Sequence, residues 1–156
     1  MRKTLVLVSV VAVFLVGAAV AWGASGRKVS TPVVVHVIEH DDNLTVTDLG
    51  PVGDSEGDLL SWLNQDYNAA NTKVVGKDQG SCIRISVADG SWQCSWTTWI
   101  NGQGSIAVEG PFYDTKDSTL AITGGTGSFR NARGVMQLSV HNDAGTEYDF
   151  EFHVIP

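Results

Sequence analysis

From residue 33 onward, short runs of apolar and β-branched residues alternate with glycine, asparagine and aspartate turn residues. This period-two pattern predicts strands, and no stretch has the apolar stripe of a four-turn amphipathic helix. We expect about eight strands, which indicate a barrel or a sandwich. The expected strands are Val33–His40, Leu59–Tyr67, Ser81–Val87, Trp92–Ile100, Ser105–Glu109, Thr119–Thr123, Val135–His141 and Glu147–Ile155, with Leu44–Leu49 as a further short candidate.

The last expected strand has the clearest alternation. Its apolar members fall on one face and its charged members on the other, which predicts one buried and one solvated face. We therefore interpret its carboxylates as a solvated outer surface rather than a metal site. The apolar set is Tyr148, Phe150, Phe152 and Val154, and the polar set is Glu147, Asp149, Glu151 and His153.

The first residues have the three parts of a secretory signal. Arg2 and Lys3 precede an uncharged run over Leu5–Val20, and small residues follow at Ala19 and Ala21. We predict a signal peptide over residues 1–24 that is cleaved near Ala21–Ala24, which makes the protein secreted. A retained membrane anchor is the alternative, because the apolar run is near the lower limit of about 17–25 residues for a membrane span. After cleavage we expect no stable membrane insertion.

The remaining residues, 25–156, have the size of a single domain. The whole chain has a formal net charge of −7. An acidic surface repels phosphate backbones, so the composition argues against a nucleic-acid partner.

The chain has two cysteines, Cys82 and Cys94. Ala88-Asp89-Gly90 is a turn signal between two expected strands, and a hairpin centred near Ala88 places the cysteines opposite each other. Opposed cross-strand Cβ atoms lie about 4.5–5.5 Å apart, which is near the range of a disulfide. In an exported protein this favours a disulfide, and two unpaired core thiols are the alternative.

Several aromatic residues lie on expected strands or just past their ends. In a small barrel such residues form either the core or the wall of a ligand cavity, and the sequence alone does not separate the two. Trp62, Asn64 and Asp66 alternate on one strand face, and a buried Asn or Asp needs hydrogen-bond partners. His36 and His40 share a strand face without an evident third ligand, so we expect no metal and no cofactor.

Four segments, in order along the chain, together resemble one superfamily of barrels. The segment Thr119–Gly134, with its Gly-Gly-Thr-Gly-x-Phe-Arg-x-Ala-Arg-Gly run, resembles the signature of allene oxide cyclase and dirigent proteins. Gly57–Tyr67 and Ser105–Phe112 resemble strand motifs of the cyclases, and Gly76–Cys82 resembles their Gly-x-x-x-Gly-x-Cys turn. The resemblance implies an all-β fold: an eight-stranded antiparallel up-and-down barrel with a central apolar cavity. It also implies a possible homotrimer.

The resemblance carries over to the cyclase site only in part. Plant allene oxide cyclases cyclise a fatty-acid epoxide with a cavity glutamate on the first strand and nearby Asn, Cys and Tyr residues. Asn64 and Cys82 match the Asn and the Cys. Alignment of Val33–Asp42 on the first strand puts His36 at the glutamate position, and Phe112 stands at the tyrosine position. These departures put the plant reaction itself in doubt.

The dirigent comparison adds two candidate residues. The segment Asp41–Thr45 resembles the dirigent Asp-Asp-Pro-Leu-Thr run, with Asn43 in place of proline. Dirigent proteins bind phenoxyl radicals or quinone methides and impose stereochemistry. Asp42 and Arg133 are the carry-over candidates for acid–base steering at the cavity mouth, and a salt bridge or loop clamp is the structural alternative for Arg133.

Our hypothesis is a secreted barrel that binds a small apolar molecule and guides its stereoselective cyclisation or coupling, mainly by confinement. A non-catalytic, lipocalin-like binder of an apolar ligand and a structural protein with a vestigial cavity are the alternatives. The expected cavity walls are Trp62, Trp96, Phe112 and Phe129, and the expected polar steering groups are Asn64, His36, Asp42 and Arg133.

Overall fold

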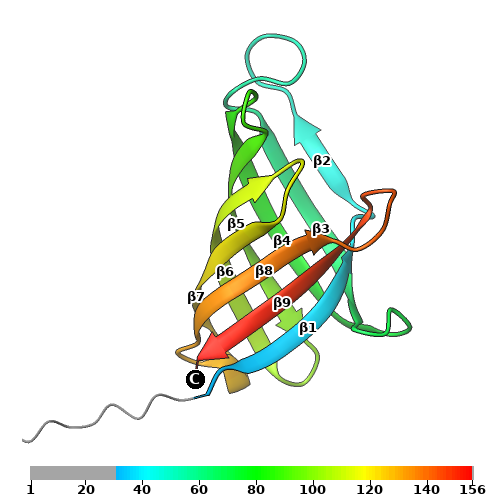
Figure 1. Cartoon of the computed structure of the whole chain (residues 1–156), viewed down its shortest axis with the longest axis vertical. Coiled ribbons are helices and arrows are strands. Elements are labelled where there is room, and N and C mark those ends of the chain that lie inside the picture. Colours follow the sequence, from blue (N-terminus) through cyan, green and yellow to red (C-terminus); the bar gives the residue numbers. More distant parts are fainter. Residues whose placement is uncertain (1–30, 156) are drawn as a thin grey trace, which may run out of the picture.

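The computed structural model describes residues 31–155, so the expected signal, its cleavage site and the start of the domain at residue 25 lie outside the described residues. The described chain is almost entirely β (Figure 1). Its strands are β1 (Val33–His40), β2 (Leu44–Thr47), β3 (Leu59–Asn68), β4 (Val74–Ser86), β5 (Ser91–Ile100), β6 (Gly104–Tyr113), β7 (Ser118–Gly125), β8 (Arg133–Val140) and β9 (Glu147–Ile155).

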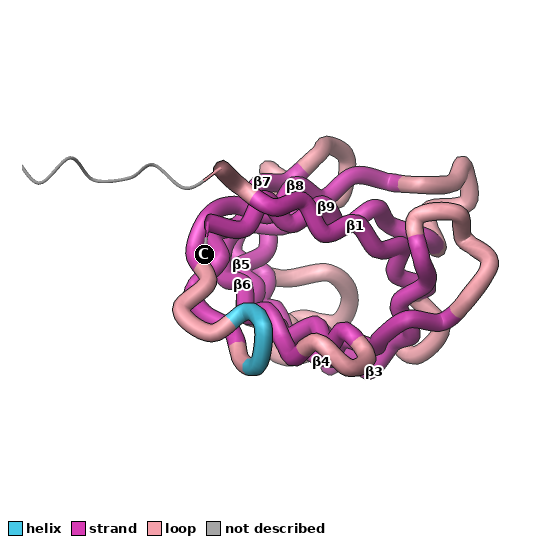
Figure 2. Tube along the Cα trace, turned by 90° about the horizontal axis from the view of Figure 1, so that it is seen from below, coloured by secondary structure: helices cyan, strands magenta, loops and turns pink. Residues whose placement is uncertain are grey.

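The sheet closes on itself. From β3 to β9 each strand pairs antiparallel with the next, and β1 pairs with both β9 and β3. The strands consequently form a ring when the molecule is viewed along its axis (Figure 2). Strand β2 pairs only with β3, through Leu44–Thr47 against Leu59–Trp62, and leans away from the ring (Figure 1). The predicted eight-stranded antiparallel barrel is confirmed, with β2 as an additional strand.

The two ends of the barrel carry different connections. The upper end in Figure 1 carries β2, the long loop over residues 48–58 and the turns β4–β5, β6–β7 and β8–β9. The lower end carries the single-turn 3-10 helix η1 (Gly127–Phe129) and the end of β9. Within residues 31–155, no helix is long and apolar enough to cross a membrane.

The apolar side chains of β9 fill the barrel interior, as the alternation in this segment predicted. Phe150, Phe152 and Val154 are buried in the core. On the opposite face of β9, Asp149 accepts hydrogen bonds from His36 and His141 at 2.7 and 2.8 Å. The outer face of β9 is therefore solvated and ion-paired.

Strand β4 is longer than the sequence indicated, because it includes Gly76 and Gly80, which we expected in a turn. Gly80 lies between Trp62 on β3 and Trp96 on β5. A Cβ atom added at Gly80 would lie 2.3 Å from the Cβ of Trp96 and 2.7 Å from a ring carbon of Trp62. The glycine is thus required inside the strand, because the two indoles pack directly over it.

The predicted disulfide is confirmed. Cys82 and Cys94 are direct cross-strand partners on β4 and β5, with Cα atoms 4.0 Å apart, and both are buried. The bond covalently fixes the register of this hairpin, and hence the position of Trp96 opposite Gly80.

Reduction of the Cys82–Cys94 bond should destabilise the fold. The bond closes a short loop, with a sequence separation of 12 residues. The chain-entropy relation gives about 3 kcal/mol for a loop of this size. We expect urea unfolding with and without a phosphine reductant to show a loss of about that amount. An unchanged free energy of unfolding, or two reactive thiols in the unreduced unfolded protein, would contradict this.

Candidate functional site

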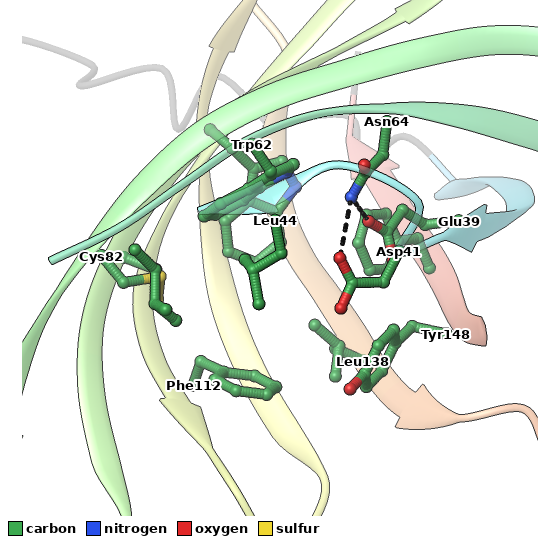
Figure 3. Close-up of a pocket in the computed structure, with 13 residues that line it drawn as sticks. Glu39, Asp41, Leu44, Trp62, Asn64, Cys82, Phe112, Leu138 and Tyr148 are labelled. Carbon is green, nitrogen blue, oxygen red and sulfur yellow. Dashed lines mark hydrogen bonds between the residues drawn. A yellow bond between two sulfur atoms is a disulfide. The ribbon is translucent and has the colours of Figure 1, made fainter. Parts of the chain in front are cut away.

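A pocket occupies the upper half of the barrel interior (Figure 3). Its cavity volume is about 90 Å³, and Leu44, which follows Asp41 after the end of β1, is its exposed lining residue, so the pocket opens on this side. Most of the wall is apolar or aromatic, and the polar groups gather on one side (Figure 3). The lining residues are Glu39, Asp41, Leu44, Leu60, Trp62, Asn64, Cys82, Cys94, Trp96, Phe112, Leu138, Tyr148 and Phe150.

The aromatic wall is held by ring-to-ring contacts between strands. Trp96 meets Trp62 edge-on with ring centroids 5.8 Å apart, and it meets Phe150 at 5.6 Å. Across the pocket, Phe112 packs against Tyr148 at 6.2 Å. These spacings lie in the favourable range for aromatic pairs, so the contacts between the rings stabilise the wall of the pocket.

Glu39 is the carboxylic acid of the pocket. Its neighbours across the sheet are Tyr148 on β9 and Asp66 on β3, and its side chain is only 5% exposed. Burial, reinforced by the charge of Asp78, raises the pKa of Glu39 to about 8, although a hydrogen bond from the amide of Asn64 opposes this shift. At neutral pH the Glu39 carboxyl is therefore mostly protonated.

Asn64 joins this acid to the mouth of the pocket. Its amide nitrogen donates to Glu39 and, at 3.5 Å, to Asp41 (Figure 3), while its carbonyl oxygen accepts from the backbone N–H of Asn43 at 2.9 Å. Burial also raises the pKa of Asp41. One amide thus fixes the chain after β1 and orients two carboxyl groups.

Two more acids lie behind Asn64, deeper in the barrel. Asp78 is paired across the sheet with Asn64 and Thr98, and it accepts a hydrogen bond of 2.6 Å from the indole N–H of Trp62. Asp66 is fully buried, and neither of its oxygens has a hydrogen-bond partner among the described residues. Burial, with mutual repulsion added for Asp66, raises the pKa of both groups. The interior therefore holds several acids that favour their neutral form.

A separate ion cluster fixes the upper rim. Buried Arg84 donates to Asp54 at 2.8 Å and to Asp114 at 2.6 Å, and its guanidinium stacks 4.3 Å from the ring of Trp92. These hydrogen bonds raise the pKa of Arg84 above its ordinary value. Because Asp54 belongs to the loop over residues 48–58, the cluster ties that loop to the barrel.

Four of the five predicted binding residues come together. Trp62, Asn64, Trp96 and Phe112 all line the pocket. Phe129 is buried in the core but belongs to η1 at the lower end, so it does not line this pocket.

The three residues predicted as catalytic are not brought together. His36 lies on the outer face of β1, bonded to Asp149, because inward positions on this strand have the opposite parity. Asp42 is exposed beyond the end of β1, and Arg133 is exposed at the start of β8, at the opposite end of the barrel. None of the three lines the pocket, so their predicted arrangement around a single cavity mouth is not what the structure shows.

Sequence reasoning missed the acid that does face the pocket. Glu39 lies three residues after His36 and therefore on the other strand face. The apolar run on both faces of β1 hid this parity, whereas the inward alternation of Val35, Val37 and Glu39 carried the signal. Tyr148 supplies a phenol beside the pocket, although the sequence alignment had placed only Phe112 there.

The fold and the pocket place the protein in the class of small closed β-barrels with an internal binding pocket. The family model for Dirigent-like protein matches residues 60–155, more than half of the chain. The chain therefore belongs to the dirigent-like family.

Solved structures share the fold. A structure titled "Pyocyanin demethylase" has 25% identity and a TM-score of 0.65, covering 76% of this chain and 98% of its own. The pterocarpan synthase dirigent protein GePTS1 has 23% identity and a TM-score of 0.65, covering 79% and 90%. The Diels Alderase AbmU from Streptomyces koyangensis has 16% identity and a TM-score of 0.57, covering 82% and 68%.

The described residues also bear on metal binding. Between residues 31 and 155, no three His, Cys, Asp or Glu side chains are arranged to hold a metal ion.

The buried acids should make the protein less stable as the pH rises. Between the unfolded pKa near 4.5 and the folded pKa of about 8, Glu39 keeps a proton in the folded state that the unfolded chain has lost. Stability should fall across this window by up to about 1.4 kcal/mol per pH unit for each such group. Urea unfolding between about pH 5 and about pH 9 measures the slope.

The matched variants are Asp66→Asn, which removes one buried acid, and Asp143→Asn in the exposed β8–β9 turn. Asp66→Asn should have a shallower decline with pH than the wild type, whereas Asp143→Asn should reproduce the wild-type slope. A stability that rises over this window, or one slope shared by all three proteins, would contradict the assignment.

Proposed function

We propose that this protein is an exported barrel that binds a small, largely apolar molecule in the upper pocket and guides its stereoselective cyclisation or coupling. The observation that carries the proposal is the position of Glu39, a buried acid that lies with Asp41 and Asn64 on one side of a mainly apolar, aromatic pocket, and burial raises its pKa to about 8. An acid held neutral by its surroundings is suited to donate a proton to a bound molecule.

Confinement supplies the first part of the chemistry. The pocket is narrow, and its walls are fixed by the Trp62–Trp96 and Phe112–Tyr148 contacts. A reactive molecule held there in a folded conformation reacts as though its ends were at very high concentration. Because the acids lie on one side only, one face of the molecule meets the proton donor, and this asymmetry selects one product stereoisomer.

Proton transfer supplies the second part. Glu39 donates a proton to a developing negative charge on the ligand, and Asn64 then stabilises the carboxylate through the hydrogen bond it already makes. A positioned acid of this kind contributes about 10²- to 10⁴-fold to a rate.

Two further observations support parts of this proposal. Membership of the dirigent-like family agrees with guided coupling, and the names of two structural neighbours describe a pterocarpan synthase and a Diels Alderase. Export is supported by the N-terminal signal pattern and by the Cys82–Cys94 disulfide, since such bonds persist in oxidising compartments.

The test begins with ligands that co-purify with the protein from its own host, identified by mass spectrometry. Each identified compound, or its open-chain precursor, is incubated with wild type, Glu39→Gln and Asp143→Asn, and the products are separated by chiral chromatography. We expect one stereoisomer in excess with the wild type, a rate at least about 10²-fold lower with Glu39→Gln, and no change with Asp143→Asn.

Two neighbouring residues of β2 provide a matched pair of variants that test where the ligand enters the pocket. Leu44 lines the pocket and Thr45, its neighbour, does not, and both side chains are exposed. Leu44→Trp should narrow the mouth and weaken ligand binding by at least tenfold, whereas Thr45→Trp should leave it unchanged. A ligand that binds without any turnover would identify a carrier instead of a coupling protein. Equal binding by both variants would show that the ligand does not enter at Leu44, which would contradict the assigned site.

A further inference from the structure

The pocket combines electron-rich aromatic faces with carboxyl groups and lacks a counter-charge. The aromatic rings come from Trp62, Trp96, Phe112 and Tyr148, and the carboxyl groups from Glu39 and Asp41. No Lys, Arg or His is present among the described residues that line it. Aromatic faces and carboxylates are the groups that recognise organic cations.

We propose that the pocket selects its ligand by charge: it takes an organic cation with an apolar body, such as a protonated amine or a cationic nitrogen heterocycle, and rejects carboxylates. The positive group lies against Glu39 and Asp41, and the apolar body lies among the aromatic rings. This inference rests on the proposed function only in taking the upper pocket as the binding site.

The carboxyl groups converge from two positions on the same side of the pocket. Asn64 contacts both Glu39 and Asp41 with one amide nitrogen, so the two side chains lie within reach of a single ligand group (Figure 3). Asp41 is half-buried at the mouth, whereas Glu39 is buried deeper. A cation that enters the pocket would therefore meet Asp41 first and Glu39 second.

Two further acids, whose oxygens lack some or all of their hydrogen-bond partners, lie in the interior behind these two. Asp66, the cross-strand neighbour of Glu39, is fully buried, and neither of its oxygens has a partner in residues 31–155. Asp78 has one oxygen bonded to Trp62 and the other without a partner there. A cation bound nearby would favour the ionised forms of these acids, because an opposite charge stabilises a carboxylate.

The same arrangement disfavours an anionic ligand. A carboxylate in the pocket would face Glu39 and Asp41 without a compensating charge, and an unpaired buried charge is costly. Arg84 is the buried cation of β4, and its guanidinium is already shared between Asp54 and Asp114. A fatty acid, the type of substrate that the cyclase resemblance would suggest, is therefore disfavoured if its carboxylate enters the pocket.

Binding of a cation should depend on pH through Glu39. The groups that face Glu39 are Asp66, Asp78, Asp41 and Asp42, with Tyr148 opposite, and none of them is cationic. Because Glu39 is protonated below about pH 8, a cation must displace its proton, and with such a ligand Glu39 is a counter-ion and not the proton donor. Affinity should therefore rise with pH, by up to about tenfold per unit below that value, and level off above it.

The experiment compares three fluorinated probes of similar size by ¹⁹F NMR titration of the mature protein: 4-fluorobenzylammonium, 4-fluorobenzyl alcohol and 4-fluorobenzoate. At a pH slightly above 8 we expect the ammonium probe to bind at least tenfold more tightly than the alcohol, and the benzoate not to bind. Isothermal titration in two buffers of different ionisation enthalpy should show proton release with the ammonium probe near neutral pH.

Variants locate the charge recognition. Glu39→Gln should lower the affinity for the ammonium probe about tenfold and remove its pH dependence, while affinity for the alcohol stays within twofold. Asp41→Asn serves as a second variant with the same expected direction, and Asp143→Asn should match the wild type.

The outcomes separate the two proposals. Equal or tighter binding of the alcohol or the benzoate would overturn charge selection and leave the pocket as the binding site. Tighter ammonium binding that persists unchanged in both Glu39→Gln and Asp41→Asn would also overturn it. Failure of all three probes to bind would overturn this inference together with the proposed function.

Discussion

Closure of the sheet is the constraint on which the site depends. Strand β1 pairs with both β9 and β3, so most inward side chains are enclosed by the other strands and shielded from water. Apolar residues gain from this burial, whereas Glu39, Asp66 and Asp78 are placed where their charged forms are disfavoured. The same geometry that builds the core thus creates a group of neutral acids beside an aromatic pocket.

The fold could be predicted because its determinants are local. Alternation and turn residues located the strands, and the spacing of Cys82 and Cys94 about Ala88 gave the register of the β4–β5 hairpin. Strand β4 was predicted too short, because Gly76 and Gly80 looked like turn residues. Their reason is tertiary: Gly80 makes room for two indoles that come from neighbouring strands. Closure between β1 and β3 likewise depends on residues far apart in the sequence.

The aromatic half of the site followed from the sequence, and the acidic half did not. Trp62, Asn64, Trp96 and Phe112 lie on strands whose facing was clear, and all four line the pocket. Both faces of β1 carry apolar residues, so the alternation did not show which face points inward. The alignment therefore put His36 at the position of the inward acid, which is Glu39 in the structure. Arg133 was grouped with Asp42 by motif, although their strand positions lie at opposite ends of the barrel. A motif gives residue identity, but the facing of a side chain depends on strand parity.

The central claim is that Glu39 stays protonated at neutral pH because the closed barrel buries it beside other acids. Carbon-13 labelling of glutamate carboxyl groups, with Glu39→Gln to assign the resonance, measures this directly by NMR titration. The account predicts a midpoint for Glu39 of about 8, well above the ordinary value of 4.5. A midpoint near 4.5 would contradict it, because the acid would then be ionised and solvated at neutral pH.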